Sequence, residues 1–226
     1  MPVKPFFIRG YEPQLLPERA LFFNDLKTLI ISDLHLGKIN HFRKAGIAVP
    51  LAANEANLET LVKLLMQHQP KRLIFIGDLF HSHYNSEWES LGSIFRNFSA
   101  CSFELVPGNH DIMSLWQYER HQIIVHPPHY NLTREIVLAH EPNQEPDPTK
   151  YFISGHVHPA IHLRGKGRHA IILPCFWFGA TQGILPAFGV FTGMKPIRPK
   201  LGDRVFAIAK GEVLDVSLPA VKNNTD

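Results

Sequence analysis

The chain has 226 residues, of which 45% are hydrophobic and 19% are charged, the composition of a globular protein with a sizeable buried core. No apolar run approaches the roughly 20 residues that a membrane helix needs, and the apolar part of residues 1–9 is too short for a secretory signal. A net charge of +3 permits binding to a polyanion without requiring it. We therefore expect one domain over residues 1–226, with a polar tail from about residue 219, in a cytoplasmic protein that does not contact a membrane.

In chain order, short apolar pieces before residue 29 predict an antiparallel meander that leads into the first core strand. Apolar residues at helical spacing predict a helix over residues 51–68, and the capping box from Ser86 to Glu89 predicts a second helix that runs to about Phe98. From residue 122 onward, short β runs and hairpins predict a second sheet packed against the first. The expected fold class is α/β of the α+β type: a four-layer αββα sandwich of two mixed β-sheets flanked by helices.

Five predicted strands end in residue types that bind metal ions. The strand and the polar residues after it are Leu29–Ser32 before Asp33 and His35, Leu73–Ile76 before Asp78, Phe103–Val106 before Asn109, His110 and Asp111, Ile136–Ala139 before His140, and Phe152–Ser154 before His156 and His158. Each of these polar groups alone is more typical of an ordinary turn than of a site. Because ligands bind outside the carboxyl ends of strands in α/β sheets, five of them together are expected to converge on one site.

The chemistry of these side chains points to hard divalent cations, because they offer carboxylate, imidazole and amide groups but no thiolate. Cys101 and Cys175 lie in apolar sequence instead, where buried free thiols are expected. Two dications together with the negative charges of Asp33 and Asp78 leave a net charge of about +2 at the site, which suits an anionic substrate such as a phosphate ester.

The motif order Asp-x-His, Gly-Asp, Gly-Asn-His-Asp, His and Gly-His-x-His resembles that of the calcineurin-like metallophosphoesterases. Further stretches narrow the resemblance to the ligase-associated DNA damage response endonucleases, the PdeM group. These stretches are Ala20 followed by Asp33 to Lys38, Phe42 to Lys44 with Gly46, Gly77 to Ser82 with Glu87 and Trp88, and Leu185 to Gly193. The likeness covers nearly the whole chain, apart from the last dozen or so residues.

This resemblance implies a centre of two divalent metal ions. Asp33, His35 and His158 would hold the first ion, Asn109, His140 and His156 would hold the second, and Asp78 would bridge them. Manganese is the favoured metal, with iron, zinc and magnesium as alternatives. A hydroxide shared by the two ions would attack phosphorus in line with the leaving oxygen.

Further residues are assigned around the ligands. His110 adjoins the ligand set without belonging to it, so we assign it as general acid to the leaving oxygen or as donor to a phosphoryl oxygen. Asp111 would orient His110 or brace the turn. From the residues alone, Lys38, Arg43 and His81 fit substrate contacts and polar loop positions equally well, and the resemblance favours substrate contacts.

The leading interpretation is a phosphodiesterase that cuts DNA as an endonuclease in DNA repair, with DNA ligase and helicase repair proteins as partners implied by the resemblance. The alternative is a phosphatase or a small-molecule phosphodiesterase, because the shared motifs do not specify what is attached to the phosphate. A binding scaffold with a decayed metal site is disfavoured, since no ligand is missing. Surface solubility explains the basic residues as readily as DNA contact does; they are Arg43, Lys44, Arg164, Lys166, Arg168, Lys195, Arg198, Lys200 and Arg204.

Overall fold

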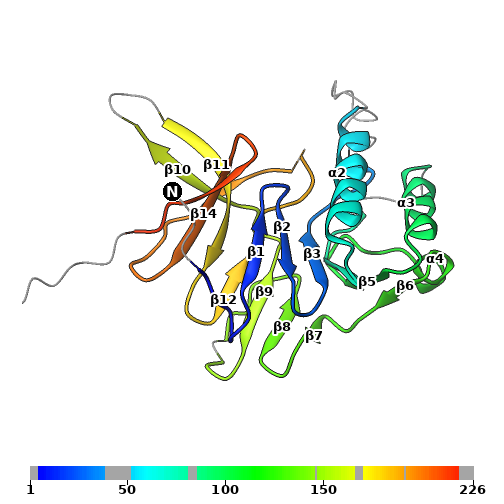
Figure 1. Ribbon diagram of the computed structural model, residues 1–226, viewed down its shortest axis with the longest axis horizontal. Helices are drawn as coiled ribbons and strands as arrows, with labels where there is room; N and C mark the ends of the chain where they lie inside the picture. Colours follow the sequence, from blue (N-terminus) through cyan, green and yellow to red (C-terminus); the bar gives the residue numbers. More distant parts are fainter. Residues whose placement is uncertain are drawn as a thin grey trace, which may run out of the picture.

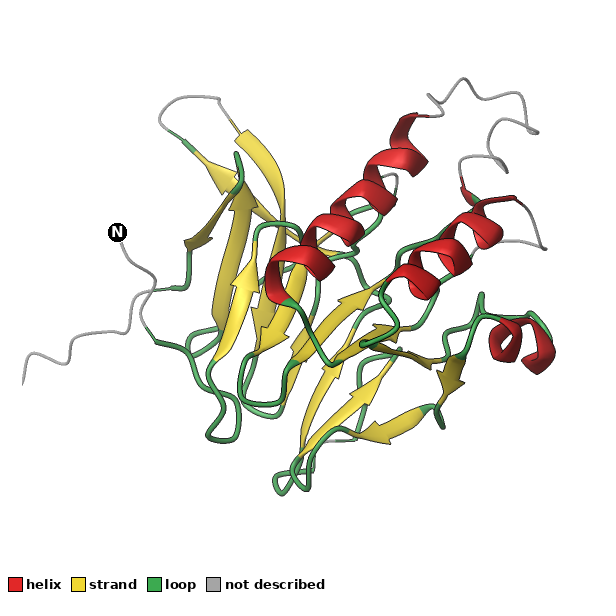
Figure 2. Cartoon of the chain, turned by 45° about the vertical axis from the view of Figure 1, so that its right-hand side comes forward, coloured by secondary structure: helices red, strands yellow, loops and turns green. Residues whose placement is uncertain are grey.

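Two β-sheets pack face to face, with helices on the outer face of the first sheet (Figures 1 and 2). The computed structural model describes residues 5–38, 52–80, 86–145, 147–165, 170–190 and 192–218. Both sheets contain parallel and antiparallel pairs, so the expected sandwich of two mixed sheets with flanking helices is confirmed.

The first sheet has six strands in sequence order. They are β1 (Pro13–Leu16), β2 (Ala20–Phe23), β3 (Thr28–Ser32), β4 (Arg72–Ile76), β5 (Ser102–Val106) and β6 (Ile123–Val125). The first three form the predicted antiparallel meander, and β3 to β6 are parallel. The carboxyl ends of β3, β4 and β5 therefore lie at one edge of the sheet.

Among the described residues, the second sheet has nine strands. They are β7 (His129–Asn131), β8 (Ile136–Ala139), β9 (Tyr151–Ser154), β10 (Pro159–Arg164), β11 (Ala170–Phe178), β12 (Gln182–Ile184), β13 (Lys195–Pro196), β14 (Arg204–Ala209) and β15 (Glu212–Asp215). The order is β13-β10-β11-β12-β9-β8-β7, with β14 paired to β11 and β15. Since β8 and β9 are parallel neighbours, the residues after them also leave the sheet at one edge.

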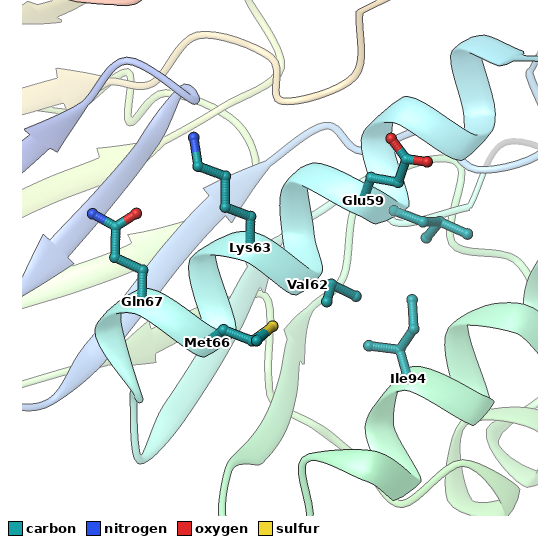
Figure 3. Close-up of a pocket in the computed structure, with 7 residues that line it drawn as sticks. Glu59, Val62, Lys63, Met66, Gln67 and Ile94 are labelled. Atoms are coloured by element: carbon teal, nitrogen blue, oxygen red, sulfur yellow. The ribbon is translucent and has the colours of Figure 1, made fainter.

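Three helices have described bounds, and all pack on the first sheet: α2 (Ala52–His68), α3 (Ser86–Asn97) and α4 (Leu115–Arg120). α2 ends where Gln69 adopts a left-handed φ of 44° and Pro70 follows, as its sequence predicts. On the second sheet, Ile197 and Val216, which lie outside the strands, pack against a small cluster around Cys175. Between α2 and α3 runs an apolar groove in which Val62 faces Ile94 (Figure 3).

The alternation of side chains along the parallel strands produces two cores. Ile74 and Ile76 of β4 point between the sheets, towards Leu138 and Ile153, whereas Leu73 and Phe75 point towards the helices. Strands that are buried on both faces read as continuous apolar runs, which is why these strands could be located in the sequence. Cys101 and Cys175 are both buried free thiols, as predicted. Among the described residues, no helix is long and apolar enough to cross a membrane.

One buried polar network joins the two sheets, from Glu104 on β5 of the first sheet to Tyr130 on β7 of the second. The Glu104 carboxylate on β5 is 3% exposed, accepts N–H bonds of 2.7 and 2.6 Å from Arg72, and lies 2.6 Å from Nε2 of His126. The same guanidinium donates to the hydroxyl of Tyr130 on the second sheet at 2.7 Å. Burial alone would raise the pKa of Glu104, but hydrogen bonds from Arg72 and His126, together with their charges, hold this pKa below its ordinary value.

Candidate metal centre

The sandwich brings seven potential ligands together from the ends of five strands. Asp33 and His35 follow β3, Asp78 follows β4, Asn109 follows β5, His140 follows β8, and His156 and His158 follow β9. The first four residues come from one sheet and the last three from the other. The ligands therefore come together where one edge of the first sheet meets one edge of the second.

One group of donor atoms consists of Asp33, His35 and His158, whose ligand atoms lie within 4.8 Å of one another. Nε2 of His158 is 3.2 Å from Oδ1 of Asp33. Asp33 and His35 are buried, so their charged or polar atoms require partners inside the protein. The group is suited to holding one cation.

The second group contains Asp78, His140 and His156, again within 4.8 Å. Nε2 of His140 lies 3.0 Å from Oδ1 of Asn109, 3.0 Å from Nδ1 of His156 and 3.5 Å from Oδ1 of Asp78. Two donor atoms that each lie about 2.1 Å from one cation, at right angles, are about 3.0 Å apart. The spacing of these four donors therefore fits a common cation.

The Asp78 carboxylate faces both groups. Its Oδ1 lies 3.5 Å from Nε2 of His140, and its Oδ2 lies 3.7 Å from Nε2 of His35. The backbone N–H of His110 donates to Oδ1 at 3.0 Å and fixes the orientation of the carboxylate. Asp78 thus presents one oxygen to each group, which is the arrangement that a bridge between two cations needs.

Backbone carbonyls orient two of the imidazoles. Nδ1 of His158 lies 3.0 Å from the carbonyl oxygen of Gly193, and Nδ1 of His140 lies 3.4 Å from that of Ile76. An N–H at Nδ1 that donates to a carbonyl leaves Nε2 unprotonated and directed at the ligand group. The tautomer suited to metal binding is therefore favoured in both rings.

The backbone at these strand ends is unusual. Five of the seven candidate ligands have left-handed φ values between 48° and 65°: Asp33, His35, Asp78, His156 and His158. Asp and His tolerate this region better than most residues, yet each such position costs on the order of 1–3 kcal/mol. Strain of this kind gathers at functional sites, where the surrounding structure holds it in place.

Two glycines allow the strand ends to approach closely. A Cβ on Gly77 would lie 2.1 Å from Nδ1 of His140, and a Cβ on Gly155 would lie 2.4 Å from Oδ2 of Asp33. The backbone N–H of His156 then donates to both oxygens of Asp33, at 3.2 and 3.0 Å, and so joins the two sheets. Any larger residue at either glycine would push the sheet edges apart.

His110 and Asp111 lie beside the ligands in the turn after β5. The ring of His110 meets that of His35 edge to face, with centroids 5.8 Å apart. The Asp111 carboxylate accepts N–H bonds from Gly108 at 2.8 Å and from Phe80 at 3.3 Å, which connect the turn to the residues after β4. Burial raises the pKa of Asp111 to about 7, against the lowering effect of these two bonds.

Lys38 is the one predicted substrate contact that the structure describes. Its ammonium is half-buried, and burial lowers its pKa, while the charges of Asp78 and Asp33 act in the opposite direction. These charges place Lys38 within electrostatic reach of the site. A hydrogen bond of 2.7 Å from the N–H of Gly37 to Oε2 of Glu87 anchors the backbone beside it. Arg43 and His81 lie outside the described residues, as do Lys44, Lys166 and Arg168.

The sequence did not reveal how the end of β3 is supported. The N–H groups of Phe188 and Gly189 donate to the carbonyl oxygens of Ser32 and Asp33, at 2.8 and 3.1 Å. Arg19 in turn donates to the carbonyl oxygens of this segment, 3.2 Å to Ala187 and 3.3 Å to Gly189. The residue types carry no signal for such backbone contacts, whose partners are more than 150 residues apart.

Two mixed sheets direct carboxylates, imidazoles and an amide to one edge, where two groups of these residues could each hold a metal ion. The family model for calcineurin-like phosphoesterases matches residues 26–160, and the chain belongs to this family. The protein is therefore a metal-dependent phosphoesterase, and the family resemblance read from the motifs is confirmed.

Among solved structures, the nuclease MPE of Pseudomonas putida is similar, with 29% sequence identity and a TM-score of 0.79 over 94% of this chain and 99% of that one. A protein of unknown function from Aquifex aeolicus has 19% identity over 62% of this chain and 82% of that one, with a TM-score of 0.40, too low to carry an argument. No curated protein sequence matches significantly.

Proposed function

We propose that the protein is a dinuclear-metal-dependent phosphodiesterase that cuts DNA internally, in DNA repair. The observation that carries the dinuclear part is the Asp78 carboxylate, whose two oxygens face two separate groups of donors. The similarity to a nuclease over nearly the full length of both chains supports DNA as the substrate.

In this proposal, seven side chains hold the two ions. Asp33, His35 and His158 bind one, Asn109, His140 and His156 bind the other, and Asp78 bridges them. Manganese is the favoured metal, with iron, zinc and magnesium as alternatives. When bound, two such ions supply an activated water and stabilise negative charge on the phosphoryl oxygens.

The chain's own residues then handle the leaving group and the substrate charge. His110 carries a proton to the leaving oxygen, because its backbone N–H is fixed to Asp78 and its ring lies against that of His35. Asp111 acts as a positioning residue for this turn. The ammonium of Lys38 contributes positive charge to a phosphate oxygen, a role that we also assign to Arg43, and His81 would contact the substrate as well.

A phosphatase or small-molecule phosphodiesterase remains the second candidate, because the same ligand set serves either substrate. A diester has a poor alkoxide leaving group, so a proton donor at His110 contributes more to its cleavage than to that of a monoester with a phenolic leaving group. The same proposal includes a role in DNA repair, with DNA ligase and helicase proteins as partners. It also includes a cytoplasmic location and a single domain over residues 1–226.

The deciding substrate is covalently closed single-stranded circular DNA, which offers no end to an exonuclease. With manganese, the protein should convert the circle to linear product, and His110→Ala should lose on the order of 10² to 10⁴ in turnover while it keeps its metal. His162→Ala, an exposed histidine on β10, is the matched control. An intact circle beside rapid hydrolysis of nucleotide monophosphates would assign the protein to the phosphatases instead.

A further inference from the structure

The segment after the turn that carries His110 exposes a patch of apolar side chains. Ile112 is 68% exposed, Leu115 is 63% exposed and Trp116 is 61% exposed, and we call these three residues the apolar patch. Single exposed apolar residues are ordinary on a protein surface. Three of them within five residues are a contiguous feature of the kind that marks an interaction site.

Trp116 is held on the outer side of α4. Tyr118 is buried and meets Trp88 edge to face, so it defines the inner side of this helix. Since each residue of a helix turns by about 100°, Trp116 points the opposite way. One turn later, the guanidinium of Arg120 lies 5.7 Å from the centre of the Trp116 ring and is held by Glu89 at 3.0 Å. The indole is thus a supported, exposed aromatic surface.

Beyond Arg120 the surface becomes a basic pocket of about 410 Å³ beside the starts of β5 and β6. Lys71, Arg96 and Arg120 line it, and none of its described lining residues is acidic. Within the part of the chain that the structure describes, Lys71 and Arg96 form no ion pair. The side chain of His121 in the wall is 2% exposed; its ring packs against Gly92 of α3, and its Nε2 lies 3.9 Å from Oε1 of Glu89. Lys71 and Arg96 therefore offer positive charge to an oxyanion at this pocket.

Along the chain, the apolar patch lies between the turn that carries His110 and Arg120, which lines the pocket. α4 lies at one end of the molecule, beside β6 and α3 (Figure 1). α4 begins at Leu115, four residues after Asp111, so it lies close to the turn after β5. Six residues span at most about 20 Å between His110 and Trp116, and a stacked strand advances about 3.4 Å per nucleotide. A base about six nucleotides or fewer from the cleaved phosphate can therefore reach Trp116.

We propose that α4 and the turn before it form a binding track for single-stranded DNA, in which an unpaired base stacks on Trp116 and backbone phosphates bind at Arg96 and Lys71. An aromatic platform combined with a basic groove is the combination by which proteins bind single strands without sequence preference. Bases of a duplex are stacked on each other and cannot offer a face to Trp116, so the track selects unpaired DNA. This inference rests on the proposed nuclease activity.

The test compares Trp116→Ala with wild type on the single-stranded circle and on bis(4-nitrophenyl) phosphate, a diester too small to reach α4. The loss of one stacked base should raise KM for the circle on the order of tenfold and leave kcat within about twofold. The KM of Trp116→Ala for the small diester should change about tenfold less than its KM for the circle. Trp116→Phe should recover much of the lost affinity for the circle. Leu201→Ala, which removes an apolar side chain that is 62% exposed elsewhere, is the matched control.

The basic pocket is tested through salt. Lys71→Gln and Arg96→Gln should each flatten the slope of log KM against log salt concentration by about 0.7, the value for one phosphate contact on a single strand. Lys210→Gln, at an exposed turn, should leave that slope unchanged. If wild type cleaves the circle but Trp116→Ala has the same KM for it as Leu201→Ala, the track is refuted. The same result is expected if the apolar patch binds a protein instead of DNA. If wild type cleaves only the small diester, the proposed nuclease function fails instead.

Discussion

Replacing Gly77 with alanine tests whether the close approach of the two sheet edges builds the site. Gly77 has a φ of +65°, so alanine there incurs a backbone cost of about 1–2 kcal/mol. The new Cβ would also lie 2.1, 2.4 and 2.8 Å from three atoms of His140. The imidazole must move by about 1.3 Å before its nearest atom reaches the 3.4 Å of an ordinary contact.

That displacement is large relative to the distances in the site. Nε2 of His140 lies 3.0 Å from both Asn109 and His156, so a shift of this size removes the imidazole from its ligand group. A misplacement of about 1 Å in a catalytic site can cost about 10²-fold in rate. We therefore expect Gly77→Ala to lose at least about 10²-fold in kcat/KM on bis(4-nitrophenyl) phosphate and to bind about one metal ion fewer per chain.

The matched control is Gly211→Ala, because Gly211 has a similar φ of +74° and a Cβ added there would meet no side chain or backbone of another segment within 4 Å. Both variants should show the backbone cost as a lower free energy of unfolding in urea, but only Gly77→Ala should lose metal and activity. Equal metal content and equal activity in the two variants would show that His140 is not a ligand or that the sheet edges can separate without consequence.

Two further predictions concern single carboxylates. Asp78→Asn should reduce metal content from about two ions per chain to one or fewer, because an amide offers one acceptor oxygen where the carboxylate offers two. The control Asp25→Asn, at an exposed turn, should retain both ions. Full metal content and full activity in Asp78→Asn would exclude the bridge. Glu104→Gln should lower the free energy of unfolding by about 2–3 kcal/mol at pH 7, measured in urea, because it removes the charge from the bonds to Arg72 and His126. The folded-state pKa of Glu104 lies below the unfolded value of about 4.3. The difference in free energy of unfolding between variant and wild type should therefore be complete above about pH 4.3 and disappear as the pH falls through the folded-state pKa. A difference that persists in acid would show that the loss comes from packing.

The strand ends could be located in the sequence because buried parallel strands carry sharp local signals. The run from Leu73 to Ile76 is apolar throughout, since β4 faces one core on each side, and it stops at Gly77 and Asp78, where the chain leaves the sheet. The polar residues that follow such runs are candidate ligands by position alone. The same reasoning found His140 after β8, although nothing in it indicated which strands of the first sheet it would face.

Contacts between distant segments could not be found in this way. The bonds from Phe188 and Gly189 to the end of β3 use backbone groups, which every sequence provides. Glu104 is different, because a glutamate inside the apolar strand from Phe103 to Val106 must be paired once it is buried, and that is a signal for a buried network. Its partners Arg72 and His126, and Tyr130 on the other side of Arg72, became identifiable only when the strands were placed next to each other.

The left-handed conformations of two ligands are held by hydrogen bonds within the protein. Asp33 and Asp78 hold positive φ angles while their carboxylates accept backbone N–H bonds from His156 and His110. Those bonds and the packing of the inter-sheet core help to fix the positions of the donors. Because the strain at these residues is offset by packing that lies outside the site, ligand substitutions should affect metal binding far more than they affect folding. The separation of the two effects is what allows Asp78→Asn to report on the bridge and not on the stability of the fold.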